Sequence, residues 1–265
     1  MRVGRSTYYK HFFSAPAPQT EENQQLRRAI LQVYSEHDKR PGSLKIKKLL
    51  QRDYGIVISP GRVFRLMNTM ELPALAAKRP KYKRFGADDE ECVNRLEQQF
   101  SQSAPNIVWV SDITYIRVGG RFYYLCVIID LFSRKVIAYK ISARIDAQLV
   151  KSTFMAAYCA RNPKGLMFHS DRGCQYTAFS FRQLLDNLNV VQSFSKKGHP
   201  YDNAVAESFF KFLKREQTNR RNYQNLKELE TSIFEYIEGY YNAKRPHTTL
   251  NYLTPNEAEK KFSLT

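Results

Sequence analysis

The stretch "NIVWVSDITYIRVGGRFYYLCVIIDLFSRKVIAYKIS", residues 106–142, decides the fold of this chain. It holds three runs of β-branched and aromatic residues, which the short turn signals "GG" and "SR" separate. The runs cover residues 106–118, 121–132 and 134–142. Runs of this length joined by such turns predict an antiparallel meander of three strands.

Helical and strand-like patterns alternate after the meander. Apolar residues at helical spacing predict helices, and short apolar runs predict strands. The predicted segments are 147–162 (helix), 165–170 (strand), 178–189 (helix), 190–195 (strand) and 204–219 (helix). The order βββαβαβα predicts an α/β fold in which a mixed sheet is flanked by helices.

The first third of the chain has a helical pattern instead. Apolar residues recur at helical spacing in 22–37, 43–55 and 59–72. Ser59 followed by Pro60 is a favourable helix start, because serine accepts an unpaired amide and proline needs no partner at the first position. This pattern predicts an all-α, helix-turn-helix-like DNA-binding domain with Arg62 and Arg65 as candidate DNA contacts. A small helical bundle with solvated arginines fits the same pattern.

Composition sets the expected domain boundaries. The pattern breaks at Pro73 and is followed by the basic "KRPKYKR" and the acidic "DDEE". We expect a helix-turn-helix-like domain at 1–72, a linker with a short helix at 73–104, a catalytic core at 105–222, and a C-terminal helix and tail at 223–265.

Charge points to a polyanionic partner. The net charge is +17, and residues 1–84 hold 18 basic and 6 acidic residues. A positive surface gains affinity for nucleic acid by releasing its condensed counterions. The sequence shows neither a membrane-spanning apolar run nor a signal peptide, so we expect a cytoplasmic protein. The four cysteines are far apart, which argues against a zinc site or a disulfide framework.

Three carboxylates form the candidate catalytic site. Asp112 lies in the first strand of the meander, Asp171 directly follows the strand "GLMFHS", and Glu207 lies in the first turn of the helix at 204–219. Carboxyl edges of strands in open α/β sheets hold functional sites. An all-oxygen ligand set suits Mg²⁺ or Mn²⁺, and two such ions serve in-line phosphoryl displacement.

The helix that carries Glu207 has two distinct faces. At 100° per residue, Lys211 and Lys214 fall on the side of Glu207, and the phenylalanines fall on the other side. Lys211, Lys214 and Arg215 are therefore candidate contacts to a DNA backbone. Lys196 and Lys197, in the glycine- and proline-broken loop before the helix, are further candidates. An exposed Glu–Lys pair on a solvated helix is the alternative interpretation.

Several motifs together resemble a known family. Thirty-five residues separate Asp171 from Glu207, and the flanking motifs are "WVSDIT", "HSDRG" and "AVAESFFKFLKRE". They resemble the D,D(35)E core of retroviral integrases and insertion-sequence transposases, above all the second-frame (OrfB) proteins of two-frame elements. The stretch "YNAKRPHTTLNYLTPNEA" at 241–258 is similar to their C-terminal signature.

The resemblance implies a ribonuclease-H-like fold and Mg²⁺-dependent cleavage and strand transfer of element ends. It implies that Asp112, Asp171 and Glu207 bind the metal and that Lys214 contacts the DNA end. We expect at least a dimer on DNA. The start "MRVGRSTYYK" resembles the tail of a frameshift joint, so a first-frame protein is a further expected partner. A non-catalytic DNA-binding protein and a ribonuclease-H-like nuclease without strand transfer remain the alternatives.

Other polar residues have structural interpretations. Asp130, at a turn with Ser133, is expected to stabilise that turn. Asp202 and Asn203 are expected to cap the following helix. His169 shares the side of Asp171, where a role near the site and a structural role are both open. For Arg245, a DNA contact and the end of a helix fit equally well.

Overall fold

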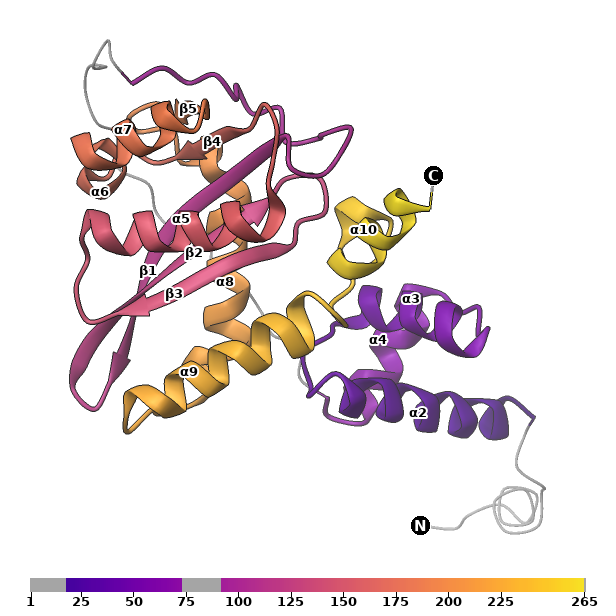
Figure 1. Cartoon of the computed structure of the whole chain (residues 1–265). Helices are drawn as coiled ribbons and strands as arrows, with labels where there is room; N and C mark the ends of the chain where they lie inside the picture. The colour runs from indigo at the N-terminus through magenta and orange to yellow at the C-terminus, as the bar shows by residue number, and fades with distance from the viewer. Residues whose placement is uncertain (1–17, 73–91, 265) are drawn as a thin grey trace, which may run out of the picture. The chain divides into compact units, whose positions relative to one another are not determined.

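The computed structural model describes residues 18–72 and 92–264, and the chain divides into two compact units, Met1–Ala76 and Ala77–Thr265. In the first unit, the described residues form three helices: α2 (Pro18–Glu36), α3 (Ser43–Tyr54) and α4 (Pro60–Thr69) (Figure 1). One apolar core joins them, with Ile30, Ile46 and Val63 fully buried. The three helices predicted from the sequence are confirmed.

Local signals set the ends of α3 and α4. Gly55 ends α3 in the left-handed region, at φ 66°, where a residue without Cβ is favoured. Ser59 begins α4, because its hydroxyl accepts a hydrogen bond from Arg62 N at 3.2 Å while Pro60 needs no partner. The expected start of this helix is confirmed.

The second unit is built around a five-stranded mixed sheet of order β3-β2-β1-β4-β5. β1, β2 and β3 form the expected antiparallel meander, and β4 and β5 run parallel to β1. The strands are β1 (Val108–Val118), β2 (Arg121–Asp130), β3 (Val136–Ser142), β4 (Met167–Ser170) and β5 (Val191–Phe194). This mixed sheet is the α/β architecture expected from the sequence.

Helices cover both faces of the sheet (Figure 1). α5 (Ala147–Arg161), α6 (Cys174–Thr177) and α7 (Phe179–Asn187) pack on the face that carries Trp109. α8 (Ala204–Glu216) and α9 (Leu226–Phe234) pack on the face that carries Val110. The remaining helical segments are the π-helix Glu235–Tyr241, the helix α10 (Pro255–Ser263) and the 3-10 turns Pro200–Asn203, Thr218–Arg220 and Thr248–Leu250.

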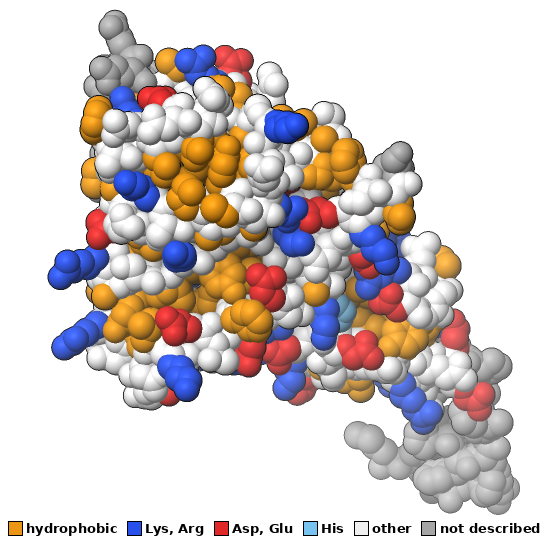
Figure 2. All heavy atoms as spheres, viewed as in Figure 1, with side chains coloured by type: hydrophobic (Ala, Val, Ile, Leu, Met, Phe, Trp, Pro, Cys, Tyr) orange, Lys and Arg blue, Asp and Glu red, His pale blue; other side chains and the backbone are white. Residues whose placement is uncertain are grey.

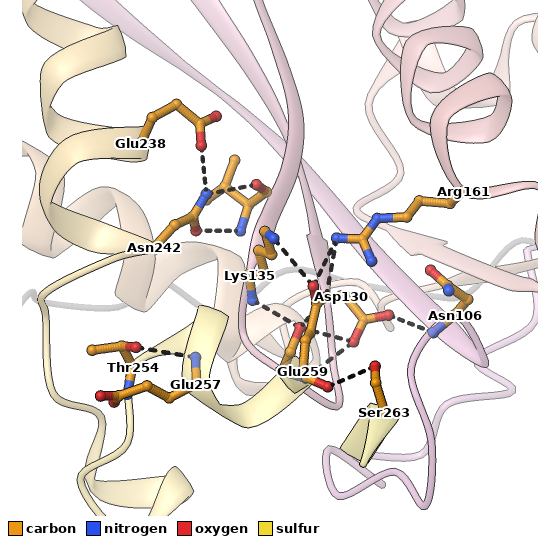
Figure 3. A network of polar contacts seen from close by, with 12 residues as sticks. Asn106, Asp130, Lys135, Arg161, Glu238, Asn242, Thr254, Glu257, Glu259 and Ser263 are labelled. Atoms are coloured by element: carbon orange, nitrogen blue, oxygen red, sulfur yellow. Dashed lines mark hydrogen bonds and ion pairs between the residues drawn. The ribbon is translucent and has the colours of Figure 1, made fainter. Parts of the chain in front are cut away.

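The C-terminal segment is tied to the sheet by polar contacts (Figure 3). The side chain of Asn242 bonds both backbone polar groups of Val136 in β3, as acceptor at 3.1 Å and donor at 3.0 Å. Glu259 of α10 pairs with Lys135 at 3.1 Å and with Arg161 at 3.0 Å. The tail is therefore an integral part of the second unit.

The turn between β2 and β3 depends on Asp130, as the sequence predicted. The buried carboxylate accepts hydrogen bonds from Asn106 N at 2.6 Å and Ser133 N at 3.0 Å. The short helix expected in the linker is absent from residues 92–104, and the rest of the linker lies outside the described residues. Among the described helices, none has the length and apolar character needed to cross a membrane.

Candidate functional site

Strand register places Asp112 and Asp171 side by side. Parallel pairing sets Val110 of β1 opposite His169 of β4, and each aspartate lies two residues beyond that pair. Because side chains alternate along a strand, both carboxylates follow the side of the sheet on which α8 packs. Neighbouring strands lie about 4.8 Å apart, so the two acids are neighbours where β4 ends beside the middle of β1.

The turn after Asp171 supports its carboxylate. Gly173 N donates a hydrogen bond to Asp171 Oδ1 at 3.0 Å. A Cβ on Gly173 would lie 2.7 Å from Gln175 Oε1 and 3.0 Å from Asp171 Oδ1, so both side chains would have to shift. The glycine therefore leaves room for the backbone to bind the carboxylate directly.

Helix α8 brings the third acid and a cation. Glu207 is exposed in its first turn, and Lys211 is exposed one turn later. Lys214 Nζ lies 4.8 Å from the ring centre of Tyr115 on β1. The opposite face of α8, with Phe209 and Leu213, is buried in the core. The two faces predicted for this helix are confirmed.

Arg215 lies apart from the lysine side of α8. Its guanidinium is 3.6 Å from Glu216 Oε1 and stacks over Phe212 at 5.4 Å. Both contacts hold it within the second unit, so its expected role at the DNA backbone has less support than that of Lys211 or Lys214.

The ionisation of the three acids is coupled. Burial raises the pKa of Asp112 to about 7, and repulsion from Asp171 and Glu207 adds to the rise, while the backbone of Ile113 and Lys214 oppose it. Burial also raises the pKa of Asp171 and of Glu207, although both have solvent-accessible surface, because surrounding protein removes part of their hydration. Burial therefore disfavours the charged form of all three acids, and Asp112 in addition feels the charge of the other two.

This donor set suits a hard divalent cation. Three carboxylates supply only oxygen ligands, and the mutual repulsion felt at Asp112 is relieved by a cation between them. Within residues 18–72 and 92–264, no three or more His, Cys, Asp or Glu side chains are already gathered as a metal site. The chemistry of the set fits a metal, and drawing the carboxylates together requires side-chain movement.

The loop before α8 carries Lys196 and Lys197, both exposed. Asp202 accepts hydrogen bonds from Lys196 N at 2.9 Å, Asn94 Nδ2 at 2.9 Å and Gln98 Nε2 at 2.8 Å. Asn203 occupies the N-cap position of α8 as expected, although its side chain makes no capping hydrogen bond, and the capping role expected for Asp202 is wrong. Asp202 instead ties this loop to the segment at 92–98, a long-range contact that sequence spacing does not show.

Three buried residues lie behind the acids; Ser111 and Tyr176 were missed in the sequence, and Asn203 was given only a capping role. Ser111 precedes Asp112, Tyr176 follows Asp171 by five residues, and Asn203 precedes Glu207 by four. Their hydrogen bonds join the three acid-bearing segments. The sequence signal for Ser111 was a polar residue in an otherwise apolar strand, and that signal was assigned to the adjacent Asp112.

His169 and Arg245 have structural roles. The fully buried His169 ring bonds Ser193 Oγ at 2.9 Å and Ser195 Oγ at 3.1 Å. Arg245 lies beyond the π-helix and forms a buried ion pair with Glu216 at 2.9 Å, so it is neither a helix end nor an exposed DNA contact.

In the first unit, Arg62 and Arg65 differ. Arg62 binds Glu22 at 3.0 Å and Asn23 at 2.9 Å on α2, whereas Arg65 is exposed on α4. Figure 2 shows lysine and arginine side chains spread over the visible face. Arg65 is the better candidate for a DNA contact.

Comparisons with known proteins match both units. An integrase core domain family matches residues 102–200, a second integrase core domain family matches 188–255, and an HTH-like domain family matches 21–82. The transposase for insertion sequence element IS904 of Lactococcus lactis subsp. lactis is 40% identical over 248 residues, or 92% of this chain and 97% of that protein. The putative transposase InsK for insertion sequence element IS150 of Escherichia coli K12 is 35% identical over 96% of this chain and 89% of that protein.

A solved structure shares the fold. The simian T-cell lymphotropic virus intasome in complex with PP2A regulatory subunit B56 gamma superimposes with a TM-score of 0.50 at 16% identity, over 87% of this chain and 73% of that chain. The ribonuclease-H-like fold implied by the sequence motifs is confirmed.

Proposed function

The chain belongs to the insertion-sequence transposases that carry an integrase core domain, and from this premise we propose that it cleaves the ends of an insertion element and joins their 3′-hydroxyls to target DNA. Joining is a transesterification. The 3′-oxygen forms a bond to a target phosphorus, the target P–O bond breaks, and the proton of the attacking hydroxyl is lost while the leaving oxygen gains one. One phosphodiester bond replaces another, so no external energy source is needed.

The observation that carries this proposal is the register of Asp112 and Asp171. Both lie two residues beyond the same β1–β4 pair, and Asp112 feels the charge of Glu207 from α8. Three acids far apart in sequence would thus meet beside the end of β4, next to the middle of β1. Sites at the carboxyl ends of strands are typical of open α/β folds.

Asp112, Asp171 and Glu207 would hold Mg²⁺ or Mn²⁺, as one ion or two, which when bound activates the attacking oxygen and stabilises the leaving one. Gly173 N keeps Asp171 oriented through its hydrogen bond. Lys211 and Lys214 lie on the same helix as Glu207 and would bind phosphates beside the acids. The exposed Lys196 and Lys197 add positive charge in the preceding loop.

The test uses the whole protein with duplexes made from the DNA that flanks its gene. With Mg²⁺, we expect cleaved ends and products in which an end is joined to a second duplex. Asp112→Asn, Asp171→Asn and Glu207→Gln should each lower the yield of joined product by at least about 100-fold, since removing a metal ligand removes its contribution to the transition state.

Other outcomes identify the alternatives. Hydrolysis without any joined product would mean a nuclease without strand transfer. Binding without cleavage in either Mg²⁺ or Mn²⁺ would mean a non-catalytic DNA-binding protein. Joining two element ends calls for at least two copies on DNA, so the joined complex should contain a dimer or a larger assembly. Adding the first-frame protein tests whether this expected partner is required.

A further inference from the structure

The three acids lie on separate segments, so something must fix the distances between these segments. Asp112 lies on β1, Asp171 in the turn from β4 to α6, and Glu207 on α8. Carboxylates that repel one another do not hold such an arrangement by themselves. The fully buried Ser111, next to Asp112, contacts both other segments.

The first contact runs from Ser111 to α6. Ser111 Oγ lies 2.8 Å from Tyr176 Oη and donates to the carbonyl of Val127 at 2.8 Å. Because the single hydroxyl proton of Ser111 goes to that carbonyl, the phenol of Tyr176 is the donor in the shared hydrogen bond. Burial raises the pKa of Tyr176 well above its ordinary value, which keeps that proton in place.

Packing makes Tyr176 a rigid anchor. Its side chain is 1% exposed and its ring lies among Phe168 and Phe181, with ring centres 6.3 and 6.2 Å away. Gln192 Nε2 on β5 donates to the backbone oxygen of Tyr176 at 2.9 Å. The turn with Asp171 and Gly173 is therefore fastened to β1 at the residue before Asp112.

The second contact runs from Ser111 to the start of α8. Asn203 Nδ2 donates to the backbone oxygen of Ser111 at 3.0 Å, and Asn203 is 5% exposed. Asn203 lies one turn before Glu207. Since a helix is stiff over one turn, this bond sets the position of the Glu207 backbone relative to β1.

We propose that Ser111, Tyr176 and Asn203 are positioning residues, which fix the three acid-bearing segments so that the carboxylates bind a divalent cation together. The proposal rests on the proposed function, because it assigns the cation to these acids. Groups that orient metal ligands through hydrogen bonds change metal affinity without touching the metal.

The chain offers a matched control for removing one phenolic oxygen. Tyr223 is 6% exposed, and its Oη bonds Ser232 Oγ at 2.9 Å, the same pair of groups as Tyr176 and Ser111. It lies beside Val118, six residues along β1 from Asp112. Tyr176→Phe and Tyr223→Phe therefore each remove a buried tyrosine–serine hydrogen bond, one between acid-bearing segments and one away from them.

The experiment measures thermal stability of the full-length protein over a Mg²⁺ titration, with EDTA as the metal-free reference. We expect both phenylalanine variants to melt a few degrees lower in EDTA, because each loses one buried hydrogen bond. The Mg²⁺ concentration for half-maximal stabilisation should rise about 10-fold in Tyr176→Phe and stay unchanged in Tyr223→Phe. Ser111→Ala should raise it likewise.

Ser111→Ala and Tyr176→Phe both remove the hydrogen bond that these two residues share. The double variant should therefore have a Mg²⁺ concentration for half-maximal stabilisation no higher than that of the single variant with the higher value. Equal Mg²⁺ midpoints for Tyr176→Phe and Tyr223→Phe would overturn the positioning role and leave the proposed function standing. If neither Mg²⁺ nor Mn²⁺ stabilises the unmodified protein, the metal site of the proposed function fails, and this inference fails with it.

Discussion

At the scale of single residues, the site is a concentration of like charge. Asp112 is the most affected acid, because it is crowded by protein and close to both other carboxylates. Sequence spacing identified the three acids, since motifs around each are local. It did not identify Ser111 or Tyr176 and gave Asn203 only a capping role, because their hydrogen bonds join residues 65 and 92 positions apart.

The raised pKa of Asp112 gives a prediction for the metal-free protein. The pKa is about 7 when folded and 3.8 ordinarily, so the folded state binds this proton more tightly than the unfolded state. The stability from this group is therefore present below about pH 4 and is lost as the pH rises through about 7. Asp112→Asn removes the charge that causes the loss.

In EDTA at about pH 8, we expect Asp112→Asn to melt above the unmodified protein, by roughly 2–4 °C for each 1 kcal/mol of repulsion relieved. Near pH 4 the difference should shrink. Scanning calorimetry over this range measures it, with Glu230→Gln at an exposed acid of α9 as the control. A lower melting temperature for Asp112→Asn at high pH would contradict the charge argument.

At the scale of elements, sequence patterns were most informative for strands and helices with a regular period. The meander and α2 to α4 follow from hydrophobic spacing and end signals such as Ser59 and Gly55. The short helix α6 was missed, and the helix expected in the C-terminal segment contains an unpredicted π-helical stretch at Glu235–Tyr241. Each is stabilised by packing of tyrosines in the core, and local propensity carries no sign of that packing.

Helix α4 allows a test of DNA contact. We expect Arg65→Ala to weaken DNA binding and to reduce the slope of log K against log salt by about 1, as for the loss of one phosphate contact. Arg62→Ala should reduce it less, because Arg62 already binds Glu22 and Asn23. Binding titrations at several salt concentrations measure both variants, and equal slopes for Arg65→Ala and the unmodified protein would exclude a phosphate contact.

At the scale of the whole molecule, the C-terminal segment completes the second unit. The core that contains Val110 of β1 and Phe209 of α8 also contains Leu229, Ile233 and Tyr236. Arg245 pairs with Glu216 at the end of α8, and Tyr236 Oη donates to the same carboxylate at 2.9 Å. Sequence patterns predicted helices in this region. They did not predict the Glu216–Arg245 ion pair, because its residues lie 29 positions apart.

The buried pair gives a prediction for stability. Glu216 and Arg245 are each 2% exposed, so Arg245→Met leaves a buried carboxylate without its closest cation, with Arg215 still at 3.6 Å. We expect a loss of about 3–5 kcal/mol in the free energy of unfolding. Glu216→Gln combined with Arg245→Met should recover part of this loss. Urea denaturation measures both, and a single variant as stable as the unmodified protein would show that the pair is not needed.

Because aromatic side chains after residue 222 fill the same core as the strands, the catalytic sheet cannot be exchanged between proteins as a cassette that stops there. A fusion that moves the three acids into another protein must also include the helical segment at 226–241. The unit of inheritance for this chemistry is therefore longer than the span of its three acids.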